Sequence, residues 1–323
     1  MDKNTIQKAI GGYFELELSS GKEYYTSALR LNTGRNSLEY ILRLRHYTKV
    51  YIPYYTCEVL LEPFHKLHID YAFYHINQDF EIADPIRLQP SEALLYTNYY
   101  GIKTQYANQL SLQYSSSLIL DNTQAFYAQP PKDIDAFNTC RKFFGVPDGA
   151  YCFTNQRLDM PLQQEVSYNR TSFLLKRLDV GAEQGYNDFR QQSENLCNLP
   201  IALMSNLTQK ILSSIDYHAV ATKRRDNFLY LHSALGNSNQ LDIHLDTQDV
   251  PMVYPYFSTK DNLRQTLIEN KIFVARYWPN VLQHTNPNTI ENNLTTYLLP
   301  LPIDQRYNRE DMERIIRIIK ENI

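Results

Sequence analysis

The feature that most constrains the fold is an alternation, between residues 33 and 126, of short apolar runs with helical segments. Four runs are rich in β-branched and aromatic residues and are typical of strands: KVYIPYY (49–55), IDYAFYHI (69–76), EALLYTNYYG (92–101) and SSSLILDNTQAF (115–126). Two segments between or before them have helical spacing of apolar residues: TGRNSLEYILRL (33–44) and EVLLEPFHKL (58–67). Strands that alternate with helices predict an α/β fold with a mainly parallel sheet flanked by helices.

After about residue 155 the pattern becomes polar and helical, and a smaller α/β part follows from about residue 220. Its expected elements are VPMVYPYF (250–257), an apolar strand in NKIFVARYWP (270–279) and a last helix, REDMERIIRIIKENI (309–323). We therefore expect a large domain over 1–220 and a small C-terminal α/β domain over 221–323.

Composition excludes several classes of protein. The formal net charge of -3 gives no basic footprint for nucleic acid. The four cysteines are scattered without a CxxC pair, which fits a reducing compartment, and the eight histidines form no metal-binding motif. The charged start, MDKNTIQKAI, lacks the apolar run of a signal peptide, and no run reaches the roughly 20 apolar residues of a membrane span. We expect a cytoplasmic protein that neither enters a membrane nor binds a metal ion.

The segment FNTCRKFFGVPDGAY (137–151) places Lys142 between aromatic residues and a turn-forming Gly-Val-Pro-Asp-Gly stretch. A lysine in such surroundings has a partly desolvated amine, and desolvation lowers its pKa. The amine can then act as a nucleophile or a base. The alternative is that Lys142 extends from a strand end into water.

Two further segments precede Lys142 along the predicted sheet. TGRNS (33–37) places a glycine and small polar residues at a helix start, where backbone N–H groups favour phosphate, although Thr33 can also act only as an N-cap. Asp121 directly follows an apolar run, so its carboxylate needs a cationic or hydrogen-bonding partner. The alternative is a turn aspartate that accepts from backbone amides.

These three features match the requirements of pyridoxal 5'-phosphate. That cofactor needs a lysine for its Schiff base, an acidic partner for its pyridinium nitrogen and an anion site for its phosphate. Lys142, Asp121 and the 33–37 segment can supply them in that order.

At these residues the sequence resembles the DegT/DnrJ/EryC1/StrS family of fold-type-I, pyridoxal-phosphate-dependent sugar aminotransferases. The resemblance extends from about Gly34 to the C-terminus. It is carried by a small-residue turn (TGRN, 33–36), a "VPSxT" strand end (IPYYT, 52–56), an "EDAAQAxGA" segment (LDNTQAFYA, 120–128), an "S-L-R-K…P-D-G-G" segment (TCRK, 139–142, and PDGA, 147–150), and the C-terminal segments RYWPNVL (276–282) and LPIDQRYNREDMERI (301–315).

The resemblance implies a role for each matched position. Lys142 would bond to the cofactor and carry the proton, Asp121 would pair with the pyridinium nitrogen, and Gln124 would lie at the phenolic oxygen. The remaining cofactor contacts would be phosphate ligands and ring-stacking residues, namely Gly34, Arg35, Asn36 and Thr139 for the phosphate and Tyr55 or Tyr100 for the ring.

The resemblance also implies the reaction and the assembly. An amino acid, with glutamate expected, would donate its amino group to a keto sugar, nucleotide-linked and used in surface polysaccharide. The active sites would form in a homodimer. One departure is that Ile201 occupies the position of an asparagine that, in many members, reaches the partner's cofactor phosphate. Two alternatives therefore stay open: a degenerate fold-type-I protein with a binding or regulatory role, and a pyridoxal-phosphate enzyme of another reaction type.

Two basic segments lie outside these motifs. Arg276 follows an apolar run beside the single tryptophan, and it can bind the donor's carboxylate in a bidentate pair. KRRDN (223–227) begins a predicted helix. We interpret it as a solvated face, with contact to a substrate phosphate as the alternative.

Overall fold

The computed structural model describes residues 10–323, so the charged start at 1–9 lies outside the described residues. Within that range the larger sheet has the order β1-β7-β6-β5-β4-β2-β3. Its strands are β1 (Leu29–Leu31), β2 (Lys49–Pro53), β3 (Asp70–Tyr74), β4 (Glu92–Thr97), β5 (Leu118–Asp121), β6 (Asp135–Phe137) and β7 (Ala150–Phe153). β2 to β6 pair in parallel, and β7 is antiparallel to both β6 and β1. The predicted α/β fold with a mainly parallel sheet is confirmed.

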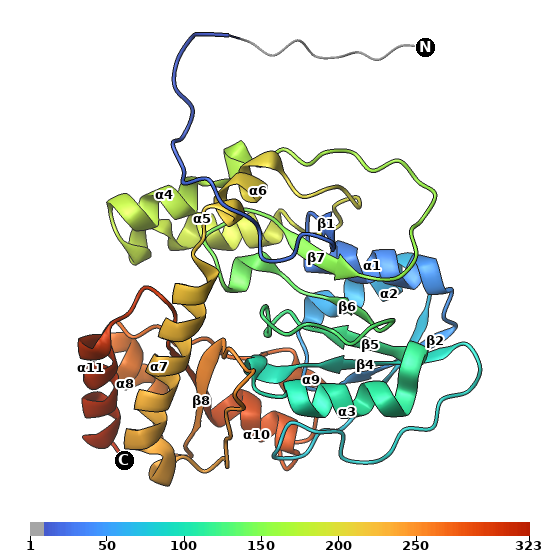
Figure 1. Cartoon of the computed structure of the whole chain (residues 1–323). Helices are drawn as coiled ribbons and strands as arrows, with labels where there is room; N and C mark the ends of the chain where they lie inside the picture. The colour runs from blue at the N-terminus through green and yellow to red at the C-terminus, as the bar shows by residue number, and fades with distance from the viewer. Residues whose placement is uncertain (1–9) are drawn as a thin grey trace.

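Helices cover both faces of this sheet (Figure 1). One face packs against α1 (Gly34–Arg45) and α2 (Glu62–Leu67), and the other packs against α3 (Thr104–Tyr114) and α7 (Tyr217–Leu235). Because side chains alternate along a strand, Leu95 of β4 joins the α1 side, whereas Leu94 and Tyr96 join the α3 side.

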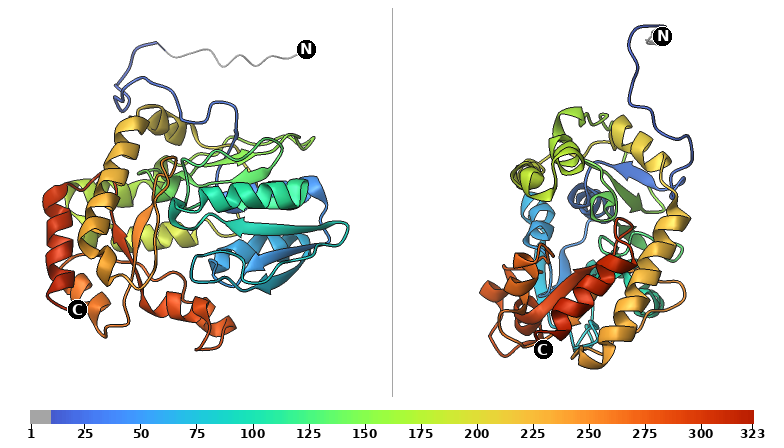
Figure 2. Two further views of the ribbon diagram at one scale, coloured as in Figure 1. Left: turned by 60° about the horizontal axis from the view of Figure 1, so that its bottom comes forward. Right: turned by 90° about the vertical axis from the view of Figure 1, so that its left-hand side faces the viewer.

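The C-terminal part is built on a second sheet, in which β8 (Val253–Phe257) is antiparallel to β9 (Leu298–Pro302). Its helices are α8 (Leu263–Glu269), α9 (Val281–His284), α10 (Ile290–Tyr297) and α11 (Arg309–Lys320). Figure 2 shows these orange and red segments gathered on one side of the molecule. The strand expected within 270–279 is wrong, because the carbonyls of Val274 and Ala275 accept from the Arg264 guanidinium and not from a neighbouring strand.

The helix α7 runs across the predicted domain boundary at residue 220. One continuous cluster of buried apolar side chains contains Leu94 of the large sheet, Phe228 of α7 and Tyr254 of the small sheet. The division into domains 1–220 and 221–323 therefore stays a prediction.

The polar stretch after residue 155 is helical, as predicted, with α4 (Ser172–Asp179), α5 (Ala182–Glu194) and α6 (Asn206–Ser213). The 3-10 turns are η1 (Glu58–Leu61), η2 (Tyr99–Gly101), η3 (Ser115–Ser117), η4 (Cys140–Lys142), η5 (Tyr168–Arg170) and η6 (Gly236–Ser238). Among residues 10–323, every helix is too short or too polar to span a bilayer. The same part of the chain holds no group of three or more His, Cys, Asp or Glu side chains that is placed to bind a metal ion.

Candidate active site

Lys142 ends the η4 turn, which follows β6 at the edge where the parallel strands end. Its Nζ donates to Thr123 Oγ1 at 3.0 Å, across the turn that follows β5. The side chain is accessible to solvent, yet enough protein surrounds the amine for desolvation to lower its pKa, and the negative charge of Asp121 opposes this shift. The amine is therefore aimed at the neighbouring strand end, and it is partly desolvated there.

Asp121 is the last residue of β5, and parallel pairing aligns it with Thr97 of β4 and Phe137 of β6. Its carboxylate is 5% exposed and accepts from the Thr123 backbone N–H at 2.9 Å. Burial raises its pKa, and the positive charge of Lys142 is the largest opposing effect. Asp121 is therefore a turn aspartate that accepts from a backbone amide, and it is also a buried carboxylate with a cation, Lys142, nearby.

The Gly-Val-Pro-Asp-Gly stretch anchors the lysine loop to the start of α6. The fully buried Asp148 carboxylate accepts from the Ser205 N–H at 2.9 Å, from the Ser205 hydroxyl at 2.7 Å and from the Thr208 hydroxyl. Gly149 has φ +108°, and a Cβ there would lie 2.8 Å from Thr208 Cγ2. Only glycine fits this turn without strain, so the stretch has a structural role beside Lys142.

The start of α1 lies against the same site. Thr33 caps the helix by accepting from the Asn36 N–H at 3.0 Å, which confirms the N-cap interpretation. A Cβ on Gly34 would lie 3.5 Å from Thr123 Cγ2 and 3.7 Å from Thr139 Cβ. The structure therefore brings Gly34 and Thr139 together beside Thr123, the residue that Lys142 contacts.

The side chains of Arg35 and Asn36 are engaged elsewhere. Arg35 pairs with Glu62 at 2.6 Å. The Asn36 Nδ2 donates to Asn32 Oδ1 and to the Pro200 carbonyl, both at 2.8 Å. Neither side chain points freely to an anion at the helix start, and their assignment to the phosphate stays a prediction.

Gln124 has an unfilled hydrogen-bonding position. Its side chain is 0% exposed, and its Oε1 accepts from the Tyr100 N–H at 2.8 Å. Its Nε2 is buried and has no hydrogen-bond partner among the described residues. Because an orphaned buried donor is costly, this amide fits a ligand with an acceptor atom, such as the oxygen of a bound cofactor.

Aromatic side chains from the C-terminal part cover the strand ends. The Tyr55 and Tyr100 hydroxyls are 2.8 Å apart, and both residues are fully buried. Trp278 packs edge-on against Tyr55, with ring centroids 4.9 Å apart, and Tyr277 stacks on Tyr100 at 6.2 Å. Stacking of Tyr55 or Tyr100 on a cofactor ring stays a prediction.

Arg276 is exposed next to this aromatic group, and its charge contributes to the lowered pKa of Arg264, about 10, of which desolvation is the main cause. Its assignment to a donor carboxylate stays a prediction. Ile201, at the position of the missing asparagine, is 8% exposed and belongs to the apolar cluster beneath α1. An apolar residue suits that buried position.

Sequence reasoning missed two residues of the site. Thr123, which the Lys142 amine contacts, was visible as part of the turn after a predicted strand. The Cys57 thiol lies near Lys142, and burial raises the pKa of this thiol. No local signal marks Cys57, since its position follows from the packing of η1.

Comparison with solved structures places the chain in the fold of the sugar aminotransferases. The sugar aminotransferase CalS13 from Micromonospora echinospora matches with a TM-score of 0.61 and 10% identity, covering 92% of this chain and 87% of that chain. A DegT DnrJ EryC1 StrS aminotransferase from Brucella abortus matches with a TM-score of 0.60 and 15% identity, covering 91% and 85%.

NtdA from Bacillus subtilis, solved with bound cofactor PMP, matches with a TM-score of 0.64 and 14% identity, covering 93% of this chain and 73% of that chain. The chain matches no protein-family model and no curated protein. At these identities the likeness establishes the fold, and the site residues must support any activity.

Proposed function

We propose that the protein is a pyridoxal-phosphate-dependent aminotransferase that moves an amino group from an amino acid to a sugar. The observation that supports this most is that Lys142 and Asp121 meet at Thr123, at one sheet edge: the Lys142 amine donates to the Thr123 hydroxyl at 3.0 Å, and the Thr123 backbone N–H donates to the buried Asp121 carboxylate at 2.9 Å. Gln124 Nε2, which has no hydrogen-bond partner within residues 10–323, gives the same edge a donor for a ligand. The fold that this chain shares with solved sugar aminotransferases supports the same function.

When bound, pyridoxal phosphate accepts the electrons of a carbanion and carries the amino group between substrates. The chain's own residues prepare the site for that chemistry. Asp121 would hold the pyridinium nitrogen with its buried carboxylate, and Lys142 supplies an amine whose lowered pKa favours the neutral, nucleophilic form. The amine can hold a proton and release it again, which suits a general base.

The finer parts of the proposal follow the sequence resemblance. The donor is glutamate, and the acceptor is a keto sugar, nucleotide-linked and destined for surface polysaccharide. The protein acts in the cytoplasm as a homodimer. Gly34 and Thr139, which lie together at the start of α1, contact the cofactor phosphate.

The test is the visible absorption spectrum of the purified protein with added pyridoxal phosphate, before and after glutamate. We expect a visible band from the bound cofactor that fades after glutamate is added. A band that glutamate leaves unchanged would contradict the donor. Absence of any band would contradict the proposed function and favour a binding or regulatory protein.

A further inference from the structure

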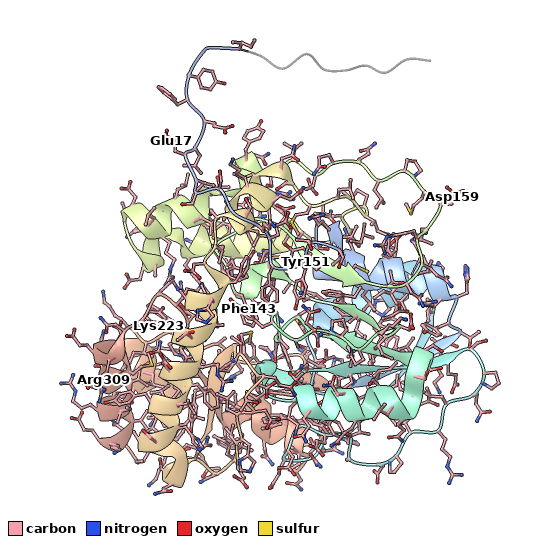
Figure 3. All side chains as sticks on the ribbon, viewed as in Figure 1. Glu17, Phe143, Tyr151, Asp159, Lys223 and Arg309 are labelled. Atoms are coloured by element: carbon pink, nitrogen blue, oxygen red, sulfur yellow. The ribbon has the colours of Figure 1, made fainter. Side chains whose placement is uncertain are left out.

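Arg224 lies in the basic segment KRRDN, yet it is 1% exposed. The interpretation of this segment as a solvated face is wrong for Arg224, because it shares a buried stripe of α7 with Val220, Phe228 and Leu231, at helical spacing. Lys223, its neighbour, is exposed, and Figure 3 shows it on α7. Within residues 10–323 Arg224 makes no ion pair, and Asp304 offsets its charge only from a longer distance.

The Arg224 guanidinium is held by oxygen atoms from distant parts of the chain. It donates to the carbonyls of Met252 at 3.0 Å and Pro251 at 3.3 Å, and its Nε donates to Gln305 Oε1 at 3.1 Å. Residues 251–252 precede β8 and Gln305 follows β9, so Arg224 joins the adjoining ends of this antiparallel pair. Burial lowers its pKa to about 10, which leaves it charged at neutral pH.

The same guanidinium reaches the lysine loop. Its Nη2 donates to the Phe143 carbonyl at 3.4 Å, and its Cζ lies 4.5 Å from the centroid of the Phe143 ring. Gln305 Nε2 donates to that carbonyl as well, at 2.8 Å. Phe143 directly follows Lys142, and Figure 3 shows it beside α7. Arg224 and Gln305 therefore both bind the backbone carbonyl of the residue that directly follows Lys142.

We propose that Arg224 and Gln305 are positioning residues that, through the Phe143 carbonyl, hold the Lys142 amine against Thr123. These two donors fix the Phe143 carbonyl, one residue after Lys142, and the Lys142 amine is fixed at its other end by Thr123. The Phe143 ring is buried and its N–H donates to the Cys140 carbonyl at 3.1 Å, so loss of one donor loosens the Phe143 carbonyl without releasing the residue. The Lys142 amine then leaves Thr123 for water more often, and its pKa rises. The catalytic meaning of this clamp rests on the proposed function, whereas its effect on the amine does not.

The test measures the pH dependence of acetylation of Lys142 by acetic anhydride in the full-length, cofactor-free protein, with the modified peptide quantified by mass spectrometry. A midpoint, unlike a rate at a single pH, separates the pKa of the amine from its accessibility. The variants are Gln305→Ala, which removes a half-buried side chain, and Arg224→Lys, which keeps the charge but loses the fork of donors. The matched control is Gln209→Ala, because Gln209 Nε2 also donates to a backbone carbonyl, that of Met204, at 2.8 Å.

We expect the midpoint for Lys142 to move upward, toward that of an ordinary lysine, in Gln305→Ala and in Arg224→Lys, and to stay unchanged in Gln209→Ala. If Arg224→Lys does not fold, Gln305→Ala decides alone. A wild-type midpoint in a folded Gln305→Ala protein, or an equal shift in Gln209→Ala, would overturn the proposal. Because the protein is cofactor-free, failure here is distinct from a missing absorption band, which would overturn the proposed function.

Discussion

Lys142 and Arg224 are two cations that the protein desolvates, and they differ in the groups that face them. Lys142 is accessible to solvent and faces a hydroxyl and a carboxylate, those of Thr123 and Asp121. Arg224 is 1% exposed and faces backbone carbonyls and one side-chain amide. Each cation also lies within the field of a carboxylate, that of Asp121 for Lys142 and that of Asp304 for Arg224, so the two differ in exposure and in the number of oxygen atoms that hold them.

This difference indicates different tasks. Desolvation lowers the pKa of both side chains, but a lysine amine gives up its proton far more readily than a guanidinium, and arginine stays protonated at neutral pH. A fixed charge bound by carbonyls from several segments joins parts of a structure. An amine with an adjustable charge, open to solvent and beside a carboxylate, suits proton transfer. Four substitutions test whether the two cations divide their roles in this way.

The largest effect is expected from Lys142→Ala. We predict that the rate of the glutamate-dependent spectral change falls by about 10²–10⁴-fold, the typical contribution of a proton-transfer group. The free energy of unfolding should stay within about 1 kcal/mol of wild type, because the side chain is accessible to solvent and makes a single hydrogen bond within residues 10–323. Stopped-flow absorbance and urea unfolding measure the two quantities. Wild-type rates in this variant would show that Lys142 takes no part in the reaction.

Arg224→Met should act in the opposite way, chiefly on stability. It leaves the carbonyls of Phe143, Pro251 and Met252 without this donor, so we predict a loss of about 3 kcal/mol in the free energy of unfolding. Urea unfolding measures it, and Lys223→Met, an exposed change on the same helix, is the control. A loss no larger than that of the control would show that the buried guanidinium does not join the two sheets.

Arg224→Lys sharpens the same point, because it separates charge from geometry. The ammonium keeps the positive charge but cannot reproduce the planar fork that reaches three segments. We predict a loss of about 1–2 kcal/mol, smaller than for methionine, in the same urea experiment. Wild-type stability would mean that the charge alone holds the contact.

The smallest effect is expected from Asp121→Asn on the cofactor-free protein. The Asp121 carboxylate raises the pKa of Lys142 against desolvation, so its neutralisation should lower the midpoint of Lys142 acetylation further below 10.5. Asp159→Asn, an exposed change after β7 (Figure 3), is the control. An upward shift of the Lys142 midpoint in Asp121→Asn would contradict the conclusion that the Asp121 carboxylate acts on the Lys142 amine.

Local patterns in the sequence predict four strands of the large sheet, whereas β1, β6 and β7, which are three or four residues long, escape prediction. The shared site of Lys142 and Asp121 is inferred from the requirements of the cofactor and from the family resemblance. Apolar runs that end in polar residues mark the carboxyl ends of the predicted strands, and parallel pairing brings these ends to the same edge of the sheet. β9 escapes prediction because LLPLP contains two prolines, which disfavour strands, and its pairing with β8 depends on packing. The burial of Arg224 escapes prediction because its partners lie at residues 143, 251, 252 and 305.

The most direct measurement is borohydride reduction of the wild-type protein incubated with stoichiometric pyridoxal phosphate, followed by peptide mapping. We predict that the reduced cofactor is recovered on Lys142, and that Lys142→Ala yields no labelled site under the same conditions. Recovery of the label on other lysines, or its persistence in Lys142→Ala, would contradict the assignment of Lys142 as the residue that bonds to the cofactor.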